Sequence, residues 1–440
     1  MGGDTVKLRV KYLFTNSESG LMEDVVVEFN ETIENVHPFQ PGEPVDRTFN
    51  RHVLMPSLVN AHTHAYSALA RGMPLKGFNP KTFKQVLEQL WWRLDRALTK
   101  EAAMMSAYVA GIESLTSGVT TIFDHHSSPM FVKGSLDVLK HVLVDTLGLR
   151  CALSYETSDR DGERVKRSAI EENLRSYHEY RSPKVRGFFG LHAPFTLSDE
   201  TISEVAKITQ KDQIPIHVHV SEGIEDFEDA RKKGSLPIER LEPAITPNSI
   251  LVHGVNLQPE EFASLSEKSV WLAFNPQSNM NNAVGLPNWE LAKKHGISAV
   301  LGNDGFGYNL VFDIRALVLS QKLRARSTTA FGFDDLRSVI FENNYKLASS
   351  VFEVSLGKIA EGYQADMVVV EYEPPTPMTN ENFLAHFFFG MLESWNPSSV
   401  FIAGRELVQD GKLITLDVSD IYKRAVEVSK KLWTRFDELL

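Results

Sequence analysis

The stretch VNAHTHAYSALARG (residues 59–72) places two histidines, His62 and His64, directly after an apolar run, Val53 to Val59, that predicts a strand. One residue separates them, and alternate residues of a strand point to the same face. Both imidazoles can therefore face the same side where the strand ends. The pair alone leaves two interpretations open: two metal ligands, or two polar side chains that finish a strand.

Short apolar runs alternate with helical stretches from residue 53 onward, which is typical of parallel βαβ units. The candidate strands number eight, as a (β/α)8 TIM barrel requires: Val53 to Val59, Val119 to Asp124, Leu149 to Tyr155, Gly187 to His192, Ile214 to Val220, Ile250 to His253, Val270 to Phe274 and Ser298 to Gly302. Residues 81–98, KTFKQVLEQLWWRLDRAL, predict a helix inserted near the barrel mouth. We therefore expect an α/β protein built around a barrel.

Both chain ends are richer in β-type sequence. Lys7 to Phe14 and Asp24 to Phe29 predict strands at the start, and the segments GKIAEGYQADMVVVEYEPPTPM and SVFIAGRELVQDGKLI predict strands after residue 357. We expect a second, smaller β domain formed by residues 1–55 and 357–440, beside a barrel of residues 56–356. A terminal helix, capped by Ser419 or Asp420, has a predicted docking face of Ile421, Ala425, Val428, Leu432, Phe436 and Leu439.

Charge and cysteine content exclude several classes of function. The formal net charge is −11 without a basic stripe, which argues against a nucleic-acid partner. No stretch approaches the roughly 20 apolar residues of a membrane span, and MGGDTVKLRV lacks the apolar core of a signal peptide, so we expect no membrane partner and a cytoplasmic location. Cys151 is the single cysteine, so a metal would need His, Asp or Glu ligands and the cysteine-ligated cytidine-deaminase fold is excluded.

Ionisable residues cluster at the carboxyl ends of the candidate strands, where barrel enzymes place their active sites. Any one histidine there is usually structural, but most of the 14 histidines lie at these ends. The residues at or just after strand ends are His62, His64, Asp124, His125, His126, His192, His217, His219, Glu222, His253 and Asp304. Neutral imidazoles with a carboxylate suit Zn²⁺ or Fe²⁺, and such an ion can activate a water molecule. Asp304 is the candidate acceptor for the released proton, and Glu222 is a candidate for proton transfer.

The chain resembles the amidohydrolase superfamily, in its cytosine-deaminase/chlorohydrolase branch. The matching segments span nearly the whole chain: MPSLVNAHTH, SGVTTIFD, GLHAPFTLS, HVHVSEG, ILVHGV, NPQSNMNN, LGNDG and GKIAEGYQADMVVV. Within this branch, LARG, LWWRLDRAL, DHHSSP, YETSDR and SNMNNAVG are most similar to the aminohydrolases called SsnA.

The resemblance implies a distorted barrel with a β-sandwich built from both chain ends, and a homo-oligomer such as a dimer. It implies one divalent metal ion, Zn²⁺ with Fe²⁺ or Mn²⁺ as alternatives, because RGFFGLHAP has no lysine where two-metal members carry one. The implied metal ligands are His62, His64, His219 and Asp304. The implied catalytic residues are Glu222, His253 and Asp304, and the expected substrate contacts are His192, Trp91 and Asn279.

These observations favour hydrolytic deamination of a purine-like or other nitrogen heterocycle by metal-activated water. Two alternatives stay open: hydrolysis of a cyclic amide or displacement of chloride at the same site, and a catalytically silent binding protein. The chain departs from the family pattern at Phe274, where relatives often carry histidine. We expect Phe274 to replace a polar substrate contact by an aromatic wall.

Overall fold

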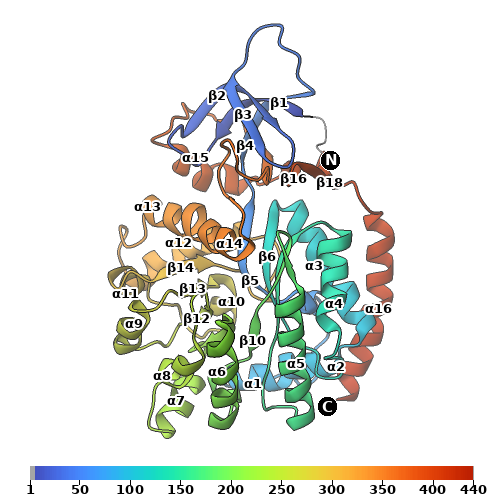
Figure 1. Cartoon of the computed structure of the whole chain (residues 1–440), viewed down its shortest axis with the longest axis vertical. Coiled ribbons are helices and arrows are strands. Elements are labelled where there is room, and N and C mark those ends of the chain that lie inside the picture. Colours follow the sequence, from blue (N-terminus) through green and yellow to red (C-terminus); the bar gives the residue numbers. More distant parts are fainter. Residues whose placement is uncertain (1–4, 440) are drawn as a thin grey trace.

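A computed structural model describes residues 5–439, so the first four residues of the expected N-terminal β segment and the last residue of the chain lie outside it. Two regions are visible in Figure 1: a β-rich unit that carries the N-terminal strands, and a larger unit in which strands and helices alternate. Among the described residues, no helix combines the length and apolar character needed to cross a membrane.

The β-rich unit is one mixed sheet made from both ends of the chain, in the order β18-β17-β16-β15-β4-β1-β2-β3. Strand β4 joins the two ends, because it pairs in parallel with β1 and antiparallel with β15. The predicted contribution of both chain ends to one β unit is thus confirmed. The strands are β1 (Val6–Phe14), β2 (Leu21–Phe29), β3 (Ile33–Pro38), β4 (Arg47–Pro56), β15 (Met367–Glu371), β16 (Pro397–Ile402), β17 (Arg405–Gln409) and β18 (Lys412–Leu413).

The larger unit contains two sheets of mostly parallel strands, in the orders β5-β6-β7-β9-β8 and β10-β11-β12-β13-β14. Its fourth strand is divided at Phe188, so that β9 pairs with β7 and β10 pairs with β11. Isolated parallel bridges, Thr157 to Leu191 and Thr63 to Asp304, link the sheets on both sides. The strands are β5 (Leu58–Thr63), β6 (Val119–His126), β7 (Arg150–Tyr155), β8 (Arg181–Ser182), β9 (Val185–Gly187), β10 (Phe189–Leu191), β11 (Ile216–Val220), β12 (Ile250–His253), β13 (Trp271–Phe274) and β14 (Ser298–Leu301).

Helices separate the strands of the larger unit and lie on its outside (Figure 1). They are α1 (Phe83–Val86), α2 (Trp92–Ala97), α3 (Lys100–Thr116), α4 (Ser135–Leu139), α5 (Glu163–Glu179), α6 (Asp199–Asp212), α7 (Ile224–Lys232), α8 (Pro237–Leu241), α9 (Pro259–Ser266), α10 (Pro276–Asn281), α11 (Trp289–Lys294), α12 (Val311–Ala325), α13 (Phe333–Leu336) and α14 (Asn344–Phe352). Two further helices belong to the C-terminal segment: α15 (Phe383–Phe389) lies between β15 and β16, and α16 (Val418–Glu438) follows β18. A π-helical segment, Leu87–Trp91, joins α1 to α2, which confirms the predicted helix over residues 81–98.

Two hydrophobic cores support this arrangement. One fills the larger unit, and a smaller one lies within the β-rich sheet around Val10, Val27 and Met367. A buried ion pair between Arg150 of β7 and Asp366, which precedes β15, connects the two units at 3.2 Å. The strands of the larger unit are buried at nearly every position, as expected for parallel strands covered on both faces.

Two predictions about the ends of elements are wrong. The run Val53 to Val59 is not one strand: its first half ends β4 in the β-rich sheet and its second half starts β5, with Ser57 between them. Pairing of β4 with the distant β15 explains this division. The side chain of Asp417, rather than Ser419 or Asp420, caps α16 by accepting the Asp420 N–H.

The terminal helix α16 packs on the larger unit, alongside α2 and α3 (Figure 1). Arg93 Nε donates to the Phe436 carbonyl, and Trp433 Nε1 donates to the Leu69 carbonyl. The predicted docking face is confirmed at Ile421, Ala425, Val428, Leu432 and Phe436, which are buried, but not at Leu439, which is exposed.

Candidate active site

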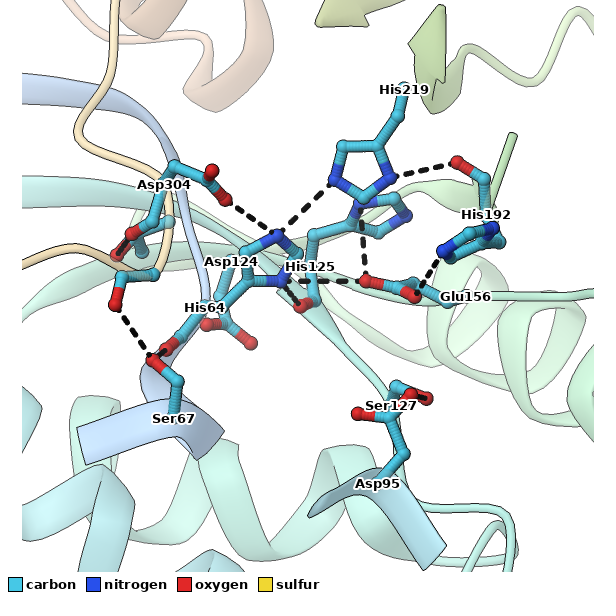
Figure 2. Close-up of polar contacts among 12 residues, drawn as sticks. His64, Ser67, Asp95, Asp124, His125, Ser127, Glu156, His192, His219 and Asp304 are labelled. Carbon is cyan, nitrogen blue, oxygen red and sulfur yellow. Dashed lines mark hydrogen bonds and ion pairs between the residues drawn. The ribbon is translucent and has the colours of Figure 1, made fainter. Parts of the chain in front are cut away.

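Three strand ends bring together the four side chains expected to bind metal. His62 lies on β5 and His64 follows it, His219 lies on β11, and Asp304 follows β14. Asp304 Oδ1 lies 3.4 Å from His62 Nε2 and 3.0 Å from His64 Nε2. His64 Nε2 lies 3.2 Å from His219 Nε2, and Figure 2 shows these groups converging.

The other ring nitrogen of each imidazole is held by the protein. His64 Nδ1 donates to the His125 carbonyl at 2.5 Å, and His219 Nδ1 donates to the His192 carbonyl at 2.8 Å. His62 Nδ1 lies 2.9 Å from His217 Nε2. Such bonds fix the ring orientation and direct each Nε2 toward the common centre.

The charges of this cluster depend on one another. Burial favours the neutral form of His62 and lowers its pKa to about 4. Burial acts on His64 in the same direction, but the adjacent Asp304 carboxylate outweighs it and raises the pKa of His64 to about 10. Burial also opposes ionisation of Asp304, yet hydrogen bonds from His62 and His64 bring its pKa well below the usual value. Without a metal, a proton on His64 thus compensates the Asp304 charge.

The donor set fits a divalent cation. His62 Nε2 is buried and has no hydrogen-bond partner within residues 5–439, although a buried polar atom normally has one. Three imidazoles with one carboxylate match the ligand preference of zinc and similar ions. Two overlapping groups each place four ligand atoms within 4.8 Å of one another: His62, His64, His125 and His219, and His62, His219, His253 and Asp304.

Glu222 and His253 form a pair beside this cluster. His253 Nε2 lies 3.4 Å from Glu222 Oε2, and Asn279 Nδ2 donates to His253 Nδ1 at 2.9 Å. The donated bond places the ring proton of His253 on Nε2, the nitrogen that faces Glu222. Burial raises the pKa of Glu222 well above its usual value and lowers that of His253 to about 3. The pair therefore combines a neutral imidazole with a carboxyl group whose protonated form is favoured by burial.

The backbone turns sharply where these side chains enter the site. His253 has φ +75°, Asp304 has φ +58° and Ser221, next to Glu222, has φ +52°. Left-handed backbone is uncommon for residues other than glycine and concentrates at functional sites. These turns end β11, β12 and β14 and let the following chain leave the site directly.

Gly302 allows the close approach of β14 to β5. A Cβ at this position would lie 2.7 Å from the backbone nitrogen and from the backbone oxygen of His62. Only a glycine fits this contact without displacing the strand that carries His62. The glycine of the LGNDG segment is thus explained by packing against the site.

The cluster opens into a cavity whose empty space, counted out to its open mouth, is about 780 Å³. His64, His219, Glu222 and Asp304 line its floor. The walls include Phe83, Leu87, Trp91, Trp92, Phe195 and Phe306. A flat heterocycle matches this combination of aromatic walls and a polar floor.

The expected substrate contacts have different outcomes. Trp91 and His192 line the cavity, as expected. Asn279 does not, because it is fully buried behind His253 and holds that ring instead. The expectation for Phe274 is wrong as well: its side chain is fully buried, packs against Trp289 with ring centroids 6.5 Å apart, and does not line the cavity.

Other polar residues at the strand ends have supporting positions. Asp124 accepts the Ala65 N–H at 2.7 Å, and His126 Nε2 lies 2.9 Å from Ser128 Oγ. His217 holds His62 and lies outside the cavity lining. His217 and His219 are alternate residues of β11 and so lie on the same face of the strand. His217 comes two residues earlier on the strand, and only His219 lines the cavity.

Glu156 is a lining residue that we did not single out from the sequence. It follows β7 and lines the cavity beside His64 and His192 (Figure 2). Burial raises its pKa to about 8. The sequence feature that could have identified Glu156 is its position in YETSDR, directly after the third candidate strand. Asn282, whose Nδ2 lies 3.4 Å from Glu222 Oε1, also lines the cavity and was not predicted.

Comparisons with known proteins agree with this geometry. The profile of the amidohydrolase family matches residues 53–407. A 5'-deoxyadenosine deaminase of Methanopyrus kandleri is 26% identical, covering 93% of this chain and 94% of the relative. A zinc-bound adenosine deaminase from Xanthomonas campestris has a similar fold, with a TM-score of 0.83 at 22% identity over 98% of both chains. An atrazine chlorohydrolase from Arthrobacter aurescens, in complex with zinc, has a TM-score of 0.80 at 19% identity, covering 96% of this chain and 100% of that chain.

Proposed function

The chain belongs to the amidohydrolase family, and on that premise we propose that it is a metal-dependent hydrolytic deaminase of purine-like or related nitrogen heterocycles. The observation that carries the proposal is the convergence of His62, His64 and Asp304 beside a Glu222–His253 pair. His64, Glu222 and Asp304 of this group line one cavity. Relatives named as deaminases of 5'-deoxyadenosine support the same reaction class.

The finer description of the fold is part of this proposal. We propose that the eight parallel strand positions close into a distorted (β/α)8 barrel over residues 56–356. Residues 1–55 and 357–440 then supply the two parts of a β-sandwich, together with the terminal helix α16, which packs on the larger unit. The two isolated bridges between the sheets support closure. In such a barrel, the carboxyl ends of the strands form the active site, which is where the clustered side chains lie.

We further propose that His62, His64, His219 and Asp304 hold one divalent ion, with zinc favoured. Solved relatives of similar fold contain zinc, and the three imidazoles with one carboxylate suit it. When bound, such an ion polarises the substrate and makes a water molecule a stronger nucleophile at neutral pH.

The remaining chemistry belongs to the side chains. Asp304 Oδ1, between His62 and His64, accepts a proton from the attacking water. His253, with its ring proton fixed on Nε2 by Asn279, holds that water by a hydrogen bond. Burial favours the protonated form of the Glu222 carboxyl group, which delivers its proton to the ring nitrogen next to the attacked carbon. Asp304 then passes the water's proton to the amino group, which leaves as ammonia while the carbonyl forms, and the proton of the added hydroxyl restores the Glu222 carboxyl group.

The test is product analysis over a panel of aminopurines, aminopurine nucleosides, pterins and chlorotriazines. The proposal predicts ammonia release from at least one compound and a loss of about 10²–10⁴ in kcat for Glu222→Gln, the usual contribution of a proton-transfer group. Glu18→Gln, at an exposed glutamate outside the cavity, is the control. Chloride release or ring opening without ammonia would instead support the alternative hydrolytic reactions.

A further inference from the structure

Among the described residues, the cavity lining carries several carboxyl groups and neither lysine nor arginine. Carboxyl groups, by contrast, come from Asp95, Glu156, Glu222, Asp226 and Asp304. Phosphate and carboxylate groups are usually recognised by Arg, Lys or free backbone amides, and this lining offers no cationic side chain of that kind.

The guanidinium nearest to these acids is already engaged. Arg160 NH1 and NH2 each lie 3.3 Å from Asp95 Oδ2, and Arg160 Nε donates to Ser158 Oγ at 3.1 Å. The Arg160 side chain is 7% exposed, lies over the ring of Trp92, and is not part of the cavity lining. It therefore neutralises Asp95 and is not free to bind an anionic ligand.

Glu156 is a nearly buried acceptor that the protein leaves without a hydrogen bond. Its side chain is 2% exposed. Within residues 5–439, the shortest contact between its carboxyl oxygens and a side-chain nitrogen is 3.4 Å, to His64 Nδ1. The other neighbours, His125 Nδ1, Arg160 NH2 and His192 Nε2, lie 3.8 to 3.9 Å away. Buried polar groups are normally bonded, so a ligand in the cavity is the natural partner of this carboxyl group.

We propose that the cavity selects neutral or positively charged amino-heterocycles, that it rejects phosphorylated and carboxylate-bearing ones, and that Glu156 accepts the N–H groups of the bound ring. This inference rests on the deaminase function proposed above and specifies its substrate class. Ring N–H and exocyclic amino groups are donors, and a carboxyl oxygen beside the reaction centre accepts them directly. An anionic substituent would instead face carboxyl groups on a lining that offers, within the described chain, no lysine or arginine to bind it.

The first test uses the unmodified zinc-loaded protein. Ammonia release is measured for adenosine and 5'-deoxyadenosine, which are neutral, and for adenosine 5'-monophosphate and adenosine-5'-carboxylic acid, which carry a phosphate and a carboxylate group. Adenine, guanine and guanosine with its 5'-monophosphate extend the set. We expect kcat/KM for the best neutral compound to exceed that of every anionic one at least tenfold. An anionic compound turned over as well as its neutral counterpart overturns the proposal.

Equilibrium binding separates this inference from the proposed reaction. Isothermal titration of the same compounds into the zinc-loaded Glu222→Gln protein measures affinity without turnover. A tenfold preference for neutral compounds supports the substrate class even if the unmodified protein releases no ammonia, an outcome that would refute only the deaminase assignment. Absence of binding by all neutral compounds contradicts the substrate class.

The role of Glu156 is tested by Glu156→Gln, with Glu172→Gln as the control at an equally buried glutamate outside the cavity. We expect Glu156→Gln to weaken binding of the preferred neutral compound at least tenfold and to reduce its advantage over anionic compounds. Zinc content, measured by mass spectrometry, should stay at the level of the unmodified protein. Unchanged affinity in a folded, zinc-containing Glu156→Gln protein overturns the assignment of Glu156.

Discussion

Each imidazole of the site uses one ring nitrogen to hold its own orientation and presents the other to the reaction. Carbonyl groups of His125 and His192 fix His64 and His219, and Asn279 fixes His253. A ring held in this way keeps one tautomer. Hydrogen bonds from neighbouring residues therefore set the orientations of His64, His219 and His253.

Asn279 offers a direct test of this positioning. Asn279→Ala removes the donor to His253 Nδ1 and leaves the ring free to change its tautomer. We expect kcat to fall roughly 10–100-fold with little change in KM, the usual effect of losing such a supporting hydrogen bond. Bound zinc should stay constant, because His253 is not among the four proposed ligands.

The control is Asn35→Ala, at an exposed asparagine on β3 in the other sheet. It should leave kcat unchanged. A loss of zinc in Asn279→Ala that equals the loss of activity would contradict the positioning role, because it would place Asn279 in support of the metal ligands themselves.

At the level of elements, the site depends on how closely neighbouring strands approach one another. Thr63 of β5 forms a parallel bridge with Asp304, which follows β14, and the His64 N–H donates to the Asp304 carbonyl. Gly302 makes this approach possible by leaving no side chain against the backbone of His62. Two ligand-bearing segments are thus held together by their main chains.

Substitution of Gly302 should disturb the metal site through the backbone alone. A methyl group in Gly302→Ala would meet the backbone of His62, so we expect a decrease in unfolding free energy of about 1–3 kcal/mol, as for other overpacked positions. Displacement of His62 should also weaken zinc binding, measured by competition with a chromogenic chelator. Gly307→Ala is the matched control, because a Cβ there meets no atom within 4 Å. Equal zinc affinity in the two variants would refute the role of this strand contact.

Across the whole molecule, the site is enclosed by segments far apart in the sequence. The first and last thirds of the chain meet where β4 pairs with β15, and the terminal helix α16 returns to pack on α2 and α3. Helix α2 in turn carries Trp92 and Asp95 into the cavity wall. The C-terminal helix therefore supports the wall of the cavity although none of its residues lines it.

Local sequence predicted which side chains cluster at the proposed metal site, because their positions follow from strand ends. Alternation along a strand and the position where it ends suffice to place His62, His64, His219 and Asp304 on one edge. The position of Asn279 behind His253 depends on the packing of α10 and could not be read from spacing. Likewise, the division of Val53 to Val59 depends on a partner strand about 300 residues away, and the importance of Glu156 depends on its burial.

The central claim is that one divalent ion, held by His62, His64, His219 and Asp304, is required for release of ammonia. It is tested most directly by titrating zinc into metal-depleted full-length protein, with bound zinc and ammonia release from the best panel compound measured in the same samples. The account predicts that activity rises in proportion to bound zinc and reaches a plateau at one ion per chain, and that His219→Ala abolishes both. Full ammonia release from protein that contains no divalent metal would contradict it.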